Sequence, residues 1–170
     1  YITSLTSDGI NIYAGTSDSG IFISNDLGLN WSDINSGLTT SNIRCIHSDS
    51  SLIYTGTSNN GLFKSDDQGA NWHQVSNGLS IESDIRCMYH YDTLLFVGTG
   101  NGEVFISLNQ GNTWTEITND LTGNPVYSLT VFDEHLYAGI NAGGVWKMPL
   151  SMITGILEKP NESNINIYPN

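Results

Sequence analysis

The chain has 170 residues, of which 38% are hydrophobic and only 13% are charged, enough apolar material for one folded domain and too much for intrinsic disorder. With only 5 Lys and Arg residues, the chain lacks the clustered basic side chains that nucleic-acid binding needs. Its formal net charge of −12 means that an anionic membrane surface would repel it. There is no run of about 18 apolar residues, so the sequence predicts no membrane span.

The predicted strands recur in units of about 40 residues. An aromatic residue followed two positions later by Gly marks each unit, at Tyr13, Tyr54, Phe96 and Tyr137. Turn-forming Gly, Asn, Asp and Ser separate short apolar runs within each unit. In the second unit these runs are 43–48, 52–57, 61–65 and 72–75, and in the fourth they are 126–131, 135–140 and 145–148. Four short strands per unit predict an all-β fold of β-propeller blades; a solenoid of stacked turns is the alternative, although its coils are usually shorter.

Three of the four units carry one motif, Ser-x-Asp-x-Gly-x-x-Trp, between their third and fourth predicted strands. Its members are Ser24, Asp26, Gly28 and Trp31, then Ser65, Asp67, Gly69 and Trp72, then Ser107, Asn109, Gly111 and Trp114. We expect a structural role: the Asp accepts backbone N–H groups of its own turn, the Gly adopts positive φ and the Trp packs between sheets. In the third motif Asn109 replaces the Asp, so a side-chain oxygen acceptor is kept but the negative charge is absent.

These motifs resemble the Asp-box, or bacterial neuraminidase, repeats of sialidase-like propellers. The resemblance covers residues 1–150, in units of about 1–37, 41–78, 83–119 and 125–150. It implies four-stranded antiparallel blades, with the boxes at the periphery and away from any catalytic centre. Because the chain opens at a bare strand, we expect about four blades that form the C-terminal arc of a larger propeller, for example a seven-bladed one; a four-bladed ring is the alternative.

The family's catalytic arrangements are not recognisable in this segment. A sialidase-like site implies three arginines and a Tyr–Glu pair, but only Arg44 and Arg86 are present, at equivalent repeat positions that indicate a structural role. A xyloglucanase-like site implies two paired carboxylates, and spacing singles out none. We therefore predict no catalytic residues and no cofactor, and a non-catalytic module that binds protein or glycan. The alternative is a fragment of a sialidase- or xyloglucanase-type hydrolase whose catalytic residues lie in other blades.

Departures from the repeat suggest where a ligand would bind. Tyr89 and Tyr91 place polar aromatic side chains at the first turn of the third unit, and they are the candidate ligand-binding residues. The four histidines lack metal-ligand spacing, so no metal site is predicted. Cys45 and Cys87 occupy the same position in neighbouring units, which favours buried thiols over a disulfide.

The tail departs from the repeat. Residues 151–164 are polar and contain Pro160, as expected of a linker. Residues 165–170, Ile-Asn-Ile-Tyr-Pro-Asn, resemble the start of the C-terminal sorting domain of the Bacteroidetes type IX secretion system. The resemblance implies a secreted or outer-membrane-surface protein that engages the type IX machinery. A photosynthetic assembly-factor-like propeller would share the repeats but not this tail.

Overall fold

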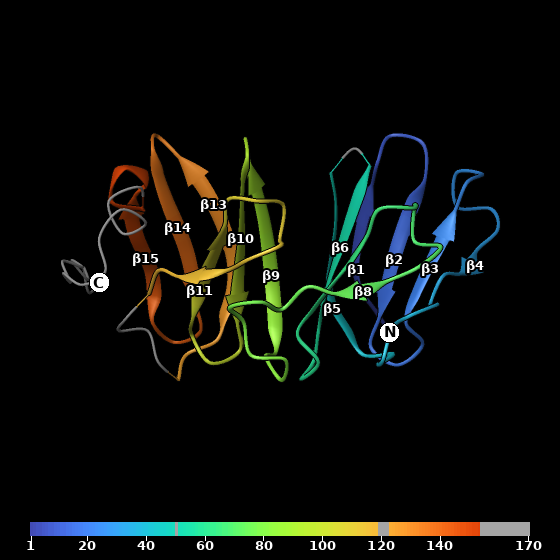
Figure 1. Ribbon diagram of the computed structural model, residues 1–170, viewed down its shortest axis with the longest axis horizontal. Helices are drawn as coiled ribbons and strands as arrows, with labels where there is room; N and C mark the ends of the chain where they lie inside the picture. Colours follow the sequence, from blue (N-terminus) through green and yellow to red (C-terminus); the bar gives the residue numbers. More distant parts are fainter. Residues whose placement is uncertain (50, 119–122, 154–170) are drawn as a thin grey trace.

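The computed structural model describes residues 1–49, 51–118 and 123–153, which form four antiparallel sheets placed side by side (Figure 1). Blade 1 contains β1 (Ile2–Ser7), β2 (Ile12–Thr16), β3 (Ile21–Ser24) and β4 (Ser32–Asp33). Blade 2 contains β5 (Ile43–Asp49), β6 (Leu52–Thr57), β7 (Leu62–Ser65) and β8 (His73–Gln74). Blade 3 contains β9 (Ile85–Tyr91), β10 (Leu94–Thr99), β11 (Val104–Ser107) and β12 (Thr115–Glu116). Blade 4 contains β13 (Val126–Phe132), β14 (His135–Ile140) and β15 (Gly144–Pro149). The predicted all-β blade architecture is confirmed.

Each sheet is built from strands that are consecutive in the chain, and each strand pairs with the next one. The first strands of the blades, β1, β5, β9 and β13, lie beside one another and form one side of the arc. All four first hairpins contain a register shift at the same end, as between Ile43 and Cys45. The repeat in sequence is therefore a repeat in backbone geometry, and the described sheets form an open arc rather than a closed ring (Figure 1).

The hydrophobic core lies between blades. Tyr13 and Ile21 of blade 1 form one buried cluster with Ile43, Phe63 and Trp72 of blade 2. Corresponding clusters join blades 2 and 3 and blades 3 and 4. Because each sheet is too thin to bury its own apolar side chains, a blade is stabilised mainly by its neighbours.

Backbone contacts fix the spacing of adjacent blades. The Trp72 backbone N–H donates to the Ser36 carbonyl at 2.8 Å, and its indole Nε1–H donates to the Ile34 carbonyl at 2.7 Å. At Gly37, where φ is +88°, an added Cβ would lie 2.2 Å from the Trp72 carbonyl oxygen. Only glycine allows both this conformation and this approach. Blade 3 repeats the arrangement with Gly78 and Trp114.

Trp31 departs from the expectation that all three motif tryptophans pack between sheets. Trp72 and Trp114 are each 4% exposed, whereas Trp31 is 41% exposed. The Trp31 Nε1–H donates to Gly28 of its own loop at 3.1 Å. The difference arises because, in the described part of the chain, no sheet covers the side of blade 1 that faces away from blade 2.

The remaining predictions concern the tail. Residues 150–153 form one helical turn, in which Ile153 is buried against blade 4. The rest of the predicted linker and the predicted sorting-domain start at 165–170 lie outside the described residues. No helix in the ranges that the structure describes is long and apolar enough to cross a membrane.

Candidate functional site

The three motif segments form closely similar loops, here called box loops (24–31, 65–72 and 107–114). In the second, Ser65 Oγ accepts the Gly69 N–H at 2.8 Å and donates to Asp67 Oδ1 at 2.8 Å. Asp67 Oδ1 also accepts the Asn71 N–H, and its Oδ2 accepts the Asn71 side-chain amide. The first loop repeats these four bonds. The motif side chains therefore bond mainly within their own turns, which is a structural use of these residues.

Hydrogen bonding also lowers the pKa of the two box carboxylates, Asp26 and Asp67. The side-chain and backbone hydrogen bonds from Asn71 lower the pKa of Asp67 to about 2. In the third loop Asn109 Oδ1 accepts the Thr113 N–H at 2.9 Å, and its Nδ2 donates to Thr113 Oγ1 at 2.8 Å. An amide thus keeps the turn without the negative charge.

The two arginines converge on one carboxylate of the chain itself. Arg44 Nε lies 3.2 Å from Asp84 Oδ1, and Arg86 Nε lies 2.7 Å from Asp84 Oδ2. The Arg86 guanidinium also lies over the Tyr127 ring, 5.5 Å from its centroid. Both arginines are thus paired through Nε with a carboxylate of the chain itself.

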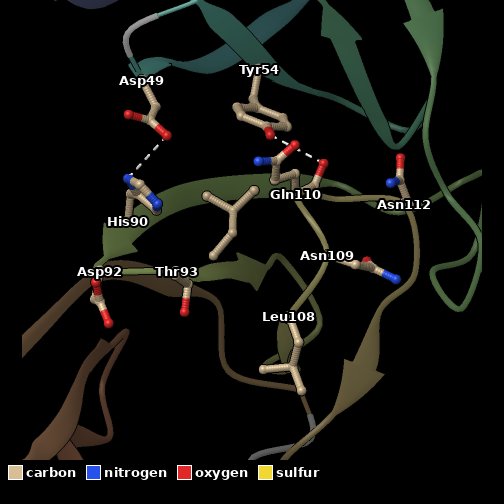
Figure 2. Close-up of a pocket in the computed structure, with 10 residues that line it drawn as sticks. Asp49, Tyr54, His90, Asp92, Thr93, Leu108, Asn109, Gln110 and Asn112 are labelled. Atoms are coloured by element: carbon tan, nitrogen blue, oxygen red, sulfur yellow. Dashed lines mark hydrogen bonds and ion pairs between the residues drawn. The ribbon is translucent and has the colours of Figure 1, made fainter.

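A cavity of about 430 Å³ opens between blades 2 and 3 (Figure 2). One wall is the end of the β5–β6 hairpin, the second is the turn between β9 and β10, and the third is the box loop of blade 3. Its lining residues are Asp49, Tyr54, His90, Asp92, Thr93, Leu95, Leu108, Asn109, Gln110 and Asn112. We call this cavity the interblade cleft. Its volume is typical of small-ligand sites, which span roughly 300–1,000 Å³.

Contacts across the interblade cleft hold its walls together. His90 Nδ1 of blade 3 lies 3.5 Å from Asp49 Oδ2 of blade 2. The Tyr54 hydroxyl and Lys64 Nζ each donate to the Gln110 carbonyl at 3.1 Å (Figure 2 shows the Tyr54 bond). The cleft is therefore a preformed feature of the blade 2–blade 3 junction.

Several polar side chains in the interblade cleft are available to a ligand. In the part of the chain that the structure describes, the side chains of Asp92, Thr93, Gln110 and Asn112 are not engaged in hydrogen bonds (Figure 2). Asp92 and Gln110 each have a positive φ of 56°, which holds them at the tips of their turns. The cleft thus offers both donors and acceptors within one concave surface.

A second histidine, His47, packs against His90. The rings of His47 and His90 are 5.9 Å apart in an edge-to-face arrangement. Burial, together with nearby His90, lowers the pKa of His47. His47 Nε2 is buried and has no hydrogen-bond partner among the described residues. A neutral His47 is the expected state at neutral pH.

Tyr89 and Tyr91, the sequence-predicted ligand residues, do not line the interblade cleft. Both are partly buried and pack against the cluster shared by blades 3 and 4. Successive strand residues point to opposite faces, so His90, between them, faces blade 2 instead. The ligand role of Tyr89 and Tyr91 stays a prediction, and it would concern a surface other than the interblade cleft.

Other candidate chemistry lies away from the interblade cleft. Burial and then the Glu103 carboxylate raise the pKa of Glu116, but neither glutamate lines the cleft. Within the described ranges, no group of three or more His, Cys, Asp or Glu side chains could hold a metal ion. Cys45 and Cys87 are free thiols, and burial raises the pKa of each to about 12.

No known family model matches the chain, and no curated protein matches it in sequence. Among solved structures, it is similar to an ancestral GH74 enzyme, with a TM-score of 0.72 and 22% identity over 86% of this chain and 22% of that one. It is also similar to the extracellular domain of a hybrid two-component system from B. thetaiotaomicron, with a TM-score of 0.71 and 16% identity over 89% of this chain and 21% of that one. YCF48 bound to D1 peptide gives a TM-score of 0.69 and 12% identity over 86% of this chain and 51% of that one.

These similarities show the fold. The chain is a β-propeller segment, and it spans about a fifth of the length of two of these structures and about half of the third. Identities at or below 22% do not transfer an activity or a ligand.

The features that sequence reasoning missed are Asp84 and the interblade cleft. Asp84 precedes β9 directly and belongs to no motif, so only the fold brings it between two arginines. A usable signal for the cleft was the third box itself, where Leu108, Asn109 and Asn112 differ from both earlier boxes.

Proposed function

We propose that this chain is part of a secreted or cell-surface propeller that acts as a non-catalytic binding module for protein or glycan. The observation that carries the proposal is the preformed interblade cleft with its unengaged polar side chains. The chain has only two arginines, and both pair through Nε with Asp84, which supports binding over sialidase-type hydrolysis with its three-arginine clamp.

The test is to profile the intact chain on glycan and peptide arrays and to assay the glycans in parallel for new reducing ends. Expected is saturable binding that is weakened by Asp92→Ala together with Gln110→Ala, with no reducing ends formed. Release of reducing ends that requires a carboxylate of the chain would overturn the proposal.

A fragment of a glycoside hydrolase is the second candidate, favoured by the similarity to the ancestral GH74 enzyme. In that case the catalytic carboxylates belong to blades outside this chain. The sequence of the complete gene separates the candidates: further blades with a non-repeated carboxylate pair or an arginine triad favour the hydrolase.

The family and the cellular location of the protein are part of the same proposal. The box sequences support membership of the Asp-box, sialidase-like propellers, and the 41% exposure of Trp31 supports a further blade beside blade 1 in a larger ring. Residues 1–150 are then propeller blades, 151–164 a linker and 165–170 the start of a sorting domain.

The tail resemblance supports export by the type IX secretion machinery of a Bacteroidetes bacterium. The full gene product, tagged and expressed in a wild-type strain and in one lacking type IX secretion, tests this. Surface display or release only in the wild type is expected; equal export by both strains would refute export through the type IX machinery.

A further inference from the structure

Several residues that distinguish blade 3 from blade 2 lie in the interblade cleft. In the third box loop, Leu108, Asn109 and Asn112 stand where blade 2 has Asp66, Asp67 and Ala70. On β9, His90 stands where blade 2 has Ser48. All four of these residues line one cavity. The interblade cleft therefore has a lining that differs in charge and hydrogen-bonding groups from the equivalent residues of blade 2.

The changes also set the charge of the interblade cleft. Leu108 and Asn109 remove from the box-loop wall the two carboxylates that blade 2 has at these positions. The other two walls contain the carboxylates of Asp49 and Asp92, of which Asp49 contacts His90. One side of the cleft thus presents carboxylate acceptors and the other presents neutral amides. The carboxylates repel an anionic ligand. A strongly cationic ligand finds carboxylates on only one side of the cleft, because the other side is neutral.

The remaining lining combines amide groups with an apolar surface. Gln110 and Asn112 each offer two donors and one acceptor that are free for a ligand. Leu108 is 51% exposed beside them, and Leu95 forms part of the floor. Neutral sugars match this combination, because their hydroxyls both donate and accept while the C–H face of a pyranose ring is apolar.

We propose that the interblade cleft binds a neutral oligosaccharide, with hydroxyls on Asp92, Gln110 and Asn112 and a pyranose face on Leu108. This assignment rests on the proposed binding function and gives its ligand class. It excludes sialylated, uronic or phosphorylated sugars as preferred ligands, since their anionic groups would approach Asp49 and Asp92.

The experiment is a titration of the 15N-labelled full chain, followed through its backbone amide resonances. The probes are neutral gluco-, galacto-, manno- and xylo-configured oligosaccharides, with lactose and 3′-sialyllactose as a pair that differs by one anionic residue. Expected are saturable shifts at His90, Gln110 and Asn112 for at least one neutral probe. Where a neutral probe binds, its sialylated counterpart should bind at least about tenfold more weakly.

Two substitutions test the residues directly, and each installs what blade 2 has at the same position. Asn112→Ala and Leu108→Asp are each expected to weaken sugar binding about tenfold or more, while the amide spectrum keeps its native dispersion. The matched control is Leu29→Ala, at the blade 1 position equivalent to Asn112, where the side chain is 82% exposed; it should leave binding unchanged.

Three outcomes would overturn the assignment: no neutral probe binds, the shifts map away from the interblade cleft, or 3′-sialyllactose binds as well as lactose. An oligolysine peptide, titrated in the same way, separates this inference from the broader function. Saturable peptide shifts in the cleft without sugar binding would overturn the sugar assignment and keep the binding function. Failure of sugars and peptide, with no array ligand, would overturn both.

Discussion

The contrast between Trp72 and Trp31 gives a direct test of how neighbouring blades stabilise one another. Trp72 is 4% exposed and its indole N–H bonds to the Ile34 carbonyl of blade 1. Replacing it with Ala should lower the free energy of unfolding by about 3–5 kcal/mol, the usual range for a buried Trp. Trp72→Phe keeps most of the apolar contact but leaves the Ile34 carbonyl unpaired, which costs about 1–3 kcal/mol.

Trp31 serves as the matched control for this series. It has the same position in its box loop, but it is 41% exposed and its indole N–H bonds to the Gly28 carbonyl of that loop rather than to another blade. Trp31→Ala should therefore cost only about 1–2 kcal/mol, from partial burial and one local hydrogen bond.

Urea unfolding followed by far-UV circular dichroism measures the series, since a fluorescence readout would change with each Trp removed. The shift in midpoint at constant m gives the change in stability. Equal shifts for Trp31→Ala and Trp72→Ala would refute the claim that contact between blades, rather than the box loop alone, makes these tryptophans stabilising. A Trp72→Phe variant as stable as the wild type would refute the contribution of the indole hydrogen bond.

Three further predictions test the loops and the thiols. Burial raises the pKa of Asp8, but bonds from its own turn outweigh this and bring it to about 2; its contribution is present above pH 4 and lost as pH falls towards 2, so Asp8→Asn should flatten the acid limb of a pH-dependent unfolding series. Gly78→Ala should lower the free energy of unfolding by about 2–5 kcal/mol, because φ is +94° and the added Cβ would lie 2.0 Å from a carbonyl oxygen of blade 3. The control is Gly9→Ala, where φ is +89° and the space around the residue is open, and it should cost only about 1–2 kcal/mol in the same urea assay. Equal costs would argue against the collision. Cys45 and Cys87, whose pKa values burial raises to about 12, should resist iodoacetamide at about pH 8 in the native state and react on unfolding, as mass spectrometry would show; rapid native-state labelling would contradict their burial.

Sequence periodicity predicted most of the fold because each blade follows from local rules. Strand runs, turn residues and the box motif recur in register, and the expected strands agree with the observed ones to within about two residues. The predicted run 43–48, for example, corresponds to β5 (Ile43–Asp49).

The candidate site was less predictable because it forms between repeats. The interblade cleft combines Asp49 of one blade with His90, Asp92 and the box loop of the next, so no single segment carries its signature. Sequence reasoning selected Tyr89 and Tyr91 from the segment around His90, and their ligand role stays a prediction. Neither residue lines the cleft, because the alternation of a strand turns neighbouring side chains to opposite faces. Which face borders the cleft depends on how the blades pack.

The charge distribution of the fold has a consequence for the solution behaviour of the protein. Of the 5 basic side chains, Arg44 and Arg86 pair with Asp84, and Lys64 Nζ donates to a backbone carbonyl. The net charge of −12 makes the electric field around the chain strongly negative, and copies of the chain repel one another at low ionic strength. At physiological salt the field decays within about 8 Å, so colloidal repulsion weakens while a partner touching the interblade cleft still meets the local charges of Asp49 and Asp92.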